Sequence, residues 1–196
     1  INHFNKNNKK KKQLISEKTA MVICYGDSVY KQNQKNLKTF QKFFNKKLSK
    51  FIDTIHFLPF YPSSSDSGFA VKDHYKIDNK FGNWIDFKKF SRNKNIMADI
   101  VINHASARGL WFKNFLKEKK PGKDYFFLVN SKFNVSRVVR PRDHKLLKEI
   151  NIFKRKDYLW RTFSDDQIDL NFKNPKVLVR FIKIMINLIK HGVTIF

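Results

Sequence analysis

Two short stretches bring together residue types that could bind a hydroxyl-rich ligand. The segment Asp99-Ile-Val-Ile-Asn-His104 is largely apolar and ends in an amide and an imidazole. The loop Ser63-Ser-Ser-Asp-Ser-Gly68 carries one carboxylate, Asp66, among turn-forming residues. A carboxylate accepts hydrogen bonds and an imidazole donates or accepts them, while an aromatic ring stacks on the apolar face of a sugar. These groups suit a neutral polyol.

Other site chemistries lack their sequence signatures. No Gly-x-Gly-x-x-Gly or Gly-x-x-x-x-Gly-Lys-Ser/Thr pattern follows an apolar run, which argues against a nucleotide-phosphate cradle. No Gly-x-Ser-x-Gly nucleophile elbow occurs, and the histidines lack the spacing of metal ligands. The single cysteine, Cys24, provides neither a disulfide nor a zinc-site pattern. We therefore expect no metal and no cofactor.

Alternating strands and helices would position the polar groups. Apolar runs predict strands at residues 20–25, 54–58, 96–102 and 193–196. Apolar residues at helical spacing predict helices over about 33–49 and 84–90, and Asn174-Pro175 begins a third helix. This alternation predicts a parallel α/β sheet, with ligands at the carboxyl ends of its strands. The polar residues expected there are Asp27, Asp66, Asn103 and His104.

Four segments are expected along the chain. Residues 1–18 form a basic, disordered tail, and residues 19–104 hold three strands with their connecting helices. Residues 105–172 are too many for an ordinary loop and include a strand-like stretch at 125–129, so they predict a small inserted subdomain. Residues 173–196 return to the sheet through a helix and the beginning of a fourth strand.

Two signatures resemble those of the α-amylase superfamily. Asp99-Ile-Val-Ile-Asn-His104 is similar to its Asp-x-Val-x-Asn-His signature, and Gln167-Ile-Asp-Leu-Asn171 is similar to its Gln-x-Asp-Leu-Asn signature. Further segments resemble the sucrose phosphorylase group within that superfamily: Ile55-His-Phe-Leu-Pro-Phe-Tyr-Pro62, Asp66-Ser-Gly-Phe69, Gly82-Asn-Trp-Ile-Asp86, Val139-Arg-Pro-Arg142 and Trp160-Arg-Thr-Phe-Ser164. The resemblance spans about residues 20–196 and implies the N-terminal half of a (β/α)8 TIM barrel, with a small subdomain inserted after strand 3.

The resemblance also implies an activity and a set of binding residues. The expected reaction is retaining transfer of an α-glucosyl group from sucrose or another small α-glucoside to inorganic phosphate, a co-substrate. Asp66 and His104 would bind glucose hydroxyls, and Phe69 would stack on the ring. Phe163 and Gln167 would line the same cleft. Arg142, with Arg140 as a second candidate, would face the acceptor side.

The same resemblance assigns no catalytic residue to this chain. It implies that the nucleophile follows within a few residues of Phe196, on the fourth strand, and that the acid/base lies further still beyond Phe196. The three glutamates, Glu17, Glu118 and Glu149, do not follow a predicted barrel strand. We therefore expect an N-terminal fragment without catalytic activity. We also expect an arginine of strand four to be the partner of Asp99.

The net charge of +25 raises a second class of function. The lysines of the chain are scattered over faces expected to meet solvent. Arginine, which makes bidentate contacts with bases in sequence-specific nucleic-acid-binding proteins, is scarce. This argues against a nucleic-acid partner, although an inert remnant acting as a basic binding or interaction protein remains the alternative. No apolar run approaches the roughly 20 residues of a membrane helix. Residues 1–13 lack the apolar core of a secretory signal, so a cytoplasmic location is expected. The sequence indicates no particular oligomeric state.

Overall fold

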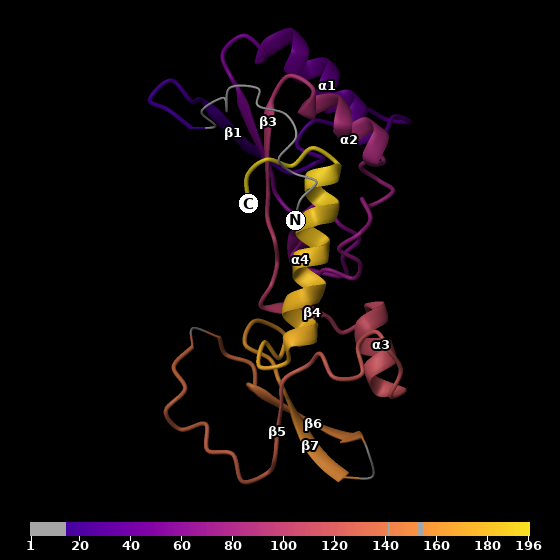
Figure 1. Ribbon diagram of the computed structural model, residues 1–196, viewed down its shortest axis with the longest axis vertical. Helices are drawn as coiled ribbons and strands as arrows, with labels where there is room; N and C mark the ends of the chain where they lie inside the picture. The colour runs from indigo at the N-terminus through magenta and orange to yellow at the C-terminus, as the bar shows by residue number, and fades with distance from the viewer. Residues whose placement is uncertain (1–14, 141, 153–154) are drawn as a thin grey trace, which may run out of the picture.

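The chain forms two lobes joined along one side by a long helix (Figure 1). The computed structural model describes residues 15–140, 142–152 and 155–196, so most of the tail predicted for residues 1–18 lies outside the described residues. One lobe holds a parallel sheet, and the other holds two small antiparallel sheets. Helix α4 (Pro175–Lys190) runs between the lobes along the longest axis of the molecule.

The first lobe is built around a three-stranded parallel sheet. Its strands are β1 (Met21–Cys24), β2 (Thr54–Phe57) and β3 (Asn95–Ala98), in that spatial order. Helices α1 (Asn36–Lys47) and α2 (Trp84–Ser91) lie in the connections between them, as a parallel sheet requires. The central strand β2 is largely buried, because it has a neighbouring strand on each side.

The helices form where local sequence signals predicted them. In α1 the residues Leu37, Phe40 and Phe44 are spaced three and four apart and are all buried, which makes one apolar stripe. The side chain of Asn83 accepts hydrogen bonds from two N–H groups in the first turn of α2. Asn174 caps α4 in the same way, and Pro175 follows it in the first turn.

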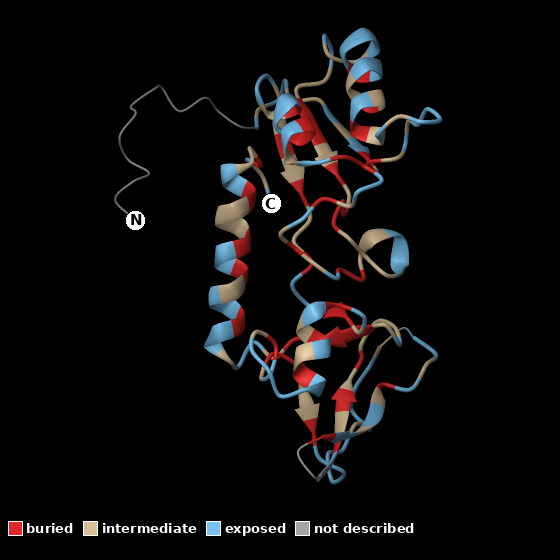
Figure 2. Ribbon diagram, turned by 90° about the vertical axis from the view of Figure 1, so that its right-hand side faces the viewer, coloured by how far each residue is buried: buried red, intermediate tan, exposed pale blue. Residues whose placement is uncertain are grey.

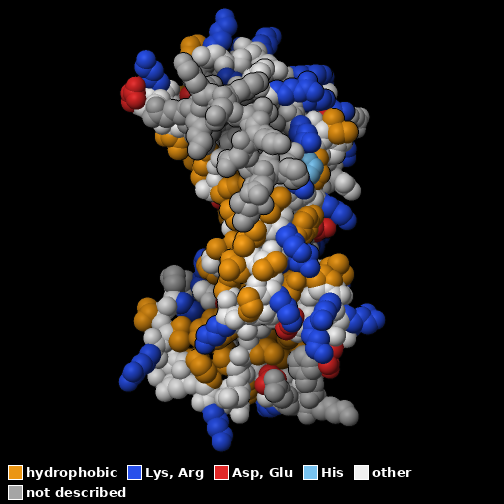
Figure 3. Space-filling view, viewed as in Figure 1, with side chains coloured by type: hydrophobic (Ala, Val, Ile, Leu, Met, Phe, Trp, Pro, Cys, Tyr) orange, Lys and Arg blue, Asp and Glu red, His pale blue; other side chains and the backbone are white. Residues whose placement is uncertain are grey.

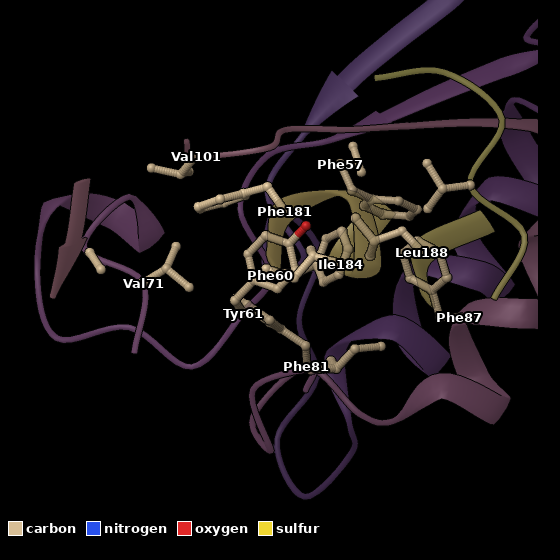
Figure 4. Close-up of a cluster of buried hydrophobic side chains, with 14 of the residues drawn as sticks. Phe57, Phe60, Tyr61, Val71, Phe81, Phe87, Val101, Phe181, Ile184 and Leu188 are labelled. Carbon is tan, nitrogen blue, oxygen red and sulfur yellow. The ribbon is translucent and has the colours of Figure 1, made fainter. Parts of the chain in front are cut away.

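An aromatic core ties α4 to the parallel sheet (Figure 4). Phe57 of β2 and Phe60 lie against Phe87 of α2, with ring centroids 5.6 and 4.9 Å from Phe87. The buried residues Ile184 and Leu188 of α4 pack in the same cluster. Figure 2 shows that the buried residues of α4 line the side that faces the two lobes.

The strand predicted at 96–102 is wrong in extent. Strand β3 stops at Ala98 because the next residues use their polar groups elsewhere. The Asp99 carbonyl accepts a hydrogen bond from the Tyr61 hydroxyl, and the Val101 carbonyl accepts one from His74. The sheet therefore ends earlier than the apolar run in the sequence.

The strand predicted at 193–196 is also wrong in extent. Ile195 forms one parallel bridge to Met97 of β3, and the N–H groups of Thr194 and Ile195 donate to the Ile96 carbonyl. Phe196 lies outside any strand and is 40% exposed. The pairing is parallel, as predicted, but the last segment is a bridge rather than a strand.

The second lobe lies between β3 and α4 in the chain. Strand β4 (His104–Ser106) pairs antiparallel with β8 (Gln167–Asp169), and helix α3 (Leu110–Leu116) follows β4. A further antiparallel sheet has the order β5 (Leu128–Val129), β7 (Arg155–Trp160) and β6 (Leu147–Ile152). The strand-like stretch predicted at 125–129 is reduced to β5 and an isolated bridge from Phe126 to Leu170.

The surface in Figure 3 is hollowed between the lobes, and hydrophobic side chains lie along the hollow. Lysine and arginine side chains on this face are spread over both lobes rather than gathered in one patch. Among the described residues, no helix has the length and apolar character needed to cross a membrane.

Candidate functional site

The loop after β2 presents Asp66 in an unusual backbone conformation. Asp66, Ser67 and Gly68 form the short 3-10 turn η1 (Asp66–Gly68), and all three have positive φ angles, of 55°, 48° and 106°. Only glycine adopts such angles freely, so the first two residues carry strain that the surrounding contacts must offset. A Cβ atom at Gly68 would lie 2.6 Å from the Pro59 carbonyl oxygen. The turn holds the Asp66 carboxylate at the surface, where a ligand can reach it.

Gln167 joins Asp66 to His104. Its side-chain Nε2 donates to Asp66 Oδ2 over 2.8 Å and lies 3.0 Å from Nε2 of His104. The same imidazole nitrogen lies 3.1 Å from the Phe69 carbonyl oxygen. When this nitrogen carries a proton, it donates to the Phe69 carbonyl. When it does not, it accepts the second N–H of the Gln167 amide. The structure thus brings together four of the predicted site residues from three separate segments.

The His104 ring is held in its neutral form. Burial lowers the pKa of the imidazole, and the Phe69 carbonyl and the Asp66 carboxylate only partly oppose this effect. Within the described part of the chain, Nδ1 of His104 is buried without a hydrogen-bond partner. A charged ring would bury an unpaired N–H group at Nδ1 and could not accept from Gln167 at Nε2, whereas a neutral ring avoids one of these two costs.

A pocket of about 220 Å³ opens beside these groups. We call it the His104 pocket; it is lined by Asp66, Phe69, residues 99–104 and Phe163. The Phe163 ring lies against the His104 ring, with centroids 4.8 Å apart. The pocket therefore combines a carboxylate, a neutral imidazole and two aromatic rings, which is the set of groups that a neutral sugar ring would need.

The segment carrying Phe163 is anchored by Asp169. Both the backbone N–H and the hydroxyl of Thr162 donate to Asp169 Oδ2, over 2.9 and 2.6 Å. Burial raises the pKa of the Asp169 carboxyl, and the two bonds from Thr162 act in the opposite direction. Asp169 thus has a structural role beside the pocket.

The structure does not bring Arg142 to the other five predicted residues. Arg142 is exposed and is not among the residues that line the His104 pocket. Arg140 is half-buried and donates to the carbonyl oxygens of His144 and Thr162, and Thr162 directly precedes Phe163. The acceptor-side role of either arginine stays a prediction.

The catalytic carboxyl groups are predicted, from the family resemblance, to follow Phe196. Its side chain is not among those that line the His104 pocket. The neighbouring Ile195 pairs with Met97, one residue before the end of β3, so this end of the chain lies beside the strand that leads to the pocket. A nucleophile and an acid/base beyond Phe196 stay a prediction.

Asp99 has a partner that the sequence did not suggest. Its Oδ2 atom lies 3.1 Å from Nε2 of His56, which projects from the otherwise apolar strand β2. The additional arginine partner expected from strand four stays a prediction. The sequence signal that could have suggested the contact with His56 is the single histidine within the second predicted strand, because a buried imidazole requires a polar partner.

A larger hollow of about 450 Å³ lies at the carboxyl ends of β1 and β2. Asp66 lines both this hollow and the His104 pocket. Asp27, predicted as a strand-end polar residue, also lines it and forms an ion pair of 3.2 Å with Lys80. In the part of the chain that the structure describes, no group of three or more His, Cys, Asp or Glu side chains could hold a metal ion.

Comparison with known proteins agrees with this geometry. The sequence model of the α-amylase catalytic domain matches residues 45–196. A glucosylglycerate phosphorylase of Allomeiothermus silvanus is 37% identical over 177 residues, which are 90% of this chain and 32% of the relative. The Escherichia coli glucosylglycerate phosphorylase is 36% identical over 187 residues, 93% of this chain and 33% of the relative. The chain thus spans about a third of the length of these relatives.

Solved structures show the same likeness. The crystal structure of sucrose 6F-phosphate phosphorylase from Thermoanaerobacter thermosaccharolyticum superposes with a TM-score of 0.80 at 27% identity, covering 92% of this chain and 39% of that one. Together with the sequence match, this assigns a TIM-barrel-type α/β fold. The chain belongs to the α-amylase family, with relatives that are glycoside phosphorylases.

Proposed function

We propose that this chain forms the glucose-binding part of a retaining glycoside phosphorylase. The whole enzyme would transfer an α-glucosyl group from sucrose or a related glucoside to inorganic phosphate. The observation that carries the proposal is the Gln167 amide, which joins Asp66 to His104 at the edge of the His104 pocket. The relatives of the chain, glucosylglycerate and sucrose phosphorylases, support the reaction class.

Each group in the pocket has a task that follows from its chemistry. The exposed Asp66 carboxylate would accept hydrogen bonds from sugar hydroxyls, and the neutral His104 would hold a further hydroxyl. Phe69 and Phe163 would cover the apolar faces of the ring. These contacts strengthen as the sugar flattens toward an oxocarbenium ion, so they would favour the transition state over the bound substrate.

The remaining chemistry would require two further carboxyl groups. In the retaining scheme a nucleophile forms a glycosyl-enzyme, and a second carboxyl group about 5–5.5 Å away acts first as acid and then as base. Inorganic phosphate replaces water in the second step. In this proposal both carboxyl groups lie beyond Phe196, and no metal or cofactor takes part.

The proposed architecture is the N-terminal half of a (β/α)8 barrel. Residues 19–104 and 173–196 would belong to the barrel, and residues 105–172 would form a subdomain inserted after the third strand. The separate antiparallel sheets between β3 and α4 support this division. Arg142 or Arg140 would face the acceptor, and a cytoplasmic location is part of the proposal.

Sugar binding by the chain itself tests the proposal. Glucose is titrated into the isotopically labelled 196-residue chain, and NMR shifts report its affinity and the residues that it contacts. We expect shifts at Phe69, His104 and Phe163, and we expect Asp66→Asn to weaken binding about tenfold or more, because hydrogen bonds to a charged group contribute about 1.5–3 kcal/mol. Glu149→Gln, which removes one exposed carboxylate on β6, is the matched control.

The reaction class is tested separately. Purified residues 1–196 are incubated with phosphate and either sucrose or glucosylglycerate, and glucose 1-phosphate is measured. We expect glucose binding without turnover. Turnover would overturn the assignment of the catalytic carboxyl groups, and absence of glucose binding in the unmodified chain would overturn the proposed role of the His104 pocket.

A further inference from the structure

The carboxylate of Asp166 contacts serine side chains from two other segments. Ser64 Oγ and Ser65 Oγ both donate to its Oδ2 atom, over 2.5 and 2.7 Å. Ser106 Oγ lies 2.5 Å from Ser64 Oγ and 3.4 Å from Oδ1 of Asp166. We call Asp166 and these three serines the Asp166 latch.

The protons of the latch have a consistent direction. The backbone N–H of Arg108 donates to Ser106 Oγ over 2.9 Å, so the Ser106 hydroxyl can donate onward to Ser64 Oγ. Ser64 in turn donates to Oδ2 of Asp166, and Ser65 donates to the same oxygen. The guanidinium Nε of Arg108 lies 3.9 Å from the other oxygen, Oδ1, and adds a weak ion pair.

Each latch residue is a close chain neighbour of a residue of the His104 pocket. Ser64 and Ser65 directly precede Asp66, Ser106 lies two residues after His104, and Asp166 directly precedes Gln167. Backbone bonds reinforce the same connections, since Ala107 N donates to the Asp166 carbonyl over 2.8 Å. One carboxylate therefore joins three segments that are far apart in the sequence.

We propose that Asp166 is a positioning residue that assembles the His104 pocket. It acts through its neighbours: its contacts hold the strained Asp66 turn against β4 and β8, so that the Gln167 amide can join Asp66 to His104. Side chains that bind a ligand need supporting contacts of this kind from neighbouring residues, because a short turn alone does not fix their position. The inference rests on the proposed sugar-binding function only for its second readout below.

The test compares two adjacent aspartates in the same turn. Asp166→Asn keeps the shape of the side chain but removes its charge and puts an NH2 group in place of one carboxylate oxygen, facing either the two serine donors at Oδ2 or Ser106 and Arg108 at Oδ1. Asp165→Asn makes the same change of charge at a side chain that is 76% exposed and pairs with Arg161 instead. The first readout is exchange of the Gln167 side-chain amide protons with water, measured by NMR, which requires no sugar. The second readout is glucose affinity.

We expect Asp166→Asn to speed the amide exchange and to weaken glucose binding, each by about tenfold or more, while Asp165→Asn changes both by less than about twofold. Equal effects of the two variants, or no effect of Asp166→Asn, would overturn the inference. Should the unmodified chain fail to bind glucose, the amide exchange still decides the role of Asp166 while the proposed function fails.

A second variant decides the matter if Asp166→Asn does not fold. Ser65 is exposed and its hydroxyl donates to Asp166, so Ser65→Ala removes one latch contact with little effect on packing. We expect faster exchange of the Gln167 amide at an unchanged midpoint of thermal unfolding. Exchange at the rate of the unmodified chain would overturn the inference.

Discussion

Acid should destabilise the fold through His74, a histidine enclosed between the lobes. Its ring is 2% exposed and is stacked on Trp111, with centroids 5.2 Å apart, and the Phe181 ring of α4 meets its edge. One ring nitrogen donates to the Val101 carbonyl over 3.2 Å. Burial lowers the pKa of His74 from 6.5 to about 4, against the smaller opposing effects of Val101 and Asp73.

The sign and size of the effect follow from this pKa. Above pH 6.5 the ring is neutral in both states, and this contribution to stability is complete. Between pH 6.5 and about 4, His74 is protonated in the unfolded chain but remains neutral in the folded chain. The free energy of unfolding therefore falls as the pH falls. With about 1.36 kcal/mol per pH unit, the loss is about 3 kcal/mol at pH 4.

Urea unfolding of the unmodified chain and of His74→Gln, followed by tryptophan fluorescence from about pH 7.5 to 4, measures this loss. Glutamine does not titrate, and all other titrating groups are shared, so their effects cancel in the difference between the two proteins. We expect His74→Gln to be the less stable protein at about pH 7.5 and the gap to close by about 3 kcal/mol at pH 4. Parallel pH profiles of the two proteins would refute the reasoning.

Three further substitutions test the packing around the site. Gly68→Ala should lower the free energy of unfolding, measured in urea, by more than about 1 kcal/mol and should weaken glucose binding. The reason is that the added Cβ would meet the Pro59 carbonyl and that residue 68 has a φ of 106°. Unchanged stability and affinity would contradict the geometry of the turn. Asn83→Ala should cost about 0.5–2 kcal/mol in the same assay through loss of the α2 cap. Ile184→Ala, at a position that is 0% exposed, should cost about 2–5 kcal/mol, and a loss below about 1 kcal/mol would show that α4 is less tightly packed than described.

Local patterns in the sequence determined three of the helices and the parallel pairing of the strands. Apolar spacing and the Asn83 and Asn174 caps act within a few residues, so α1, α2 and α4 could be predicted close to their observed bounds. The type of sheet followed from alternation of strands and helices. The signatures at Asp66, His104 and Gln167 identified pocket residues through family resemblance, without showing how these residues meet.

Only the tertiary structure decided where the strands end and which side chains come into contact. Strand β3 ends at Ala98 because the carbonyls of Asp99 and Val101 bond to Tyr61 and His74, which are far from them in the sequence. Gln167 reaches Asp66 across 101 residues, and Asp166 reaches Ser65 across the same separation. Such contacts depend on the path of the whole chain. Local patterns determine which face of a segment is apolar, but a polar partner is selected only when packing brings the segments together.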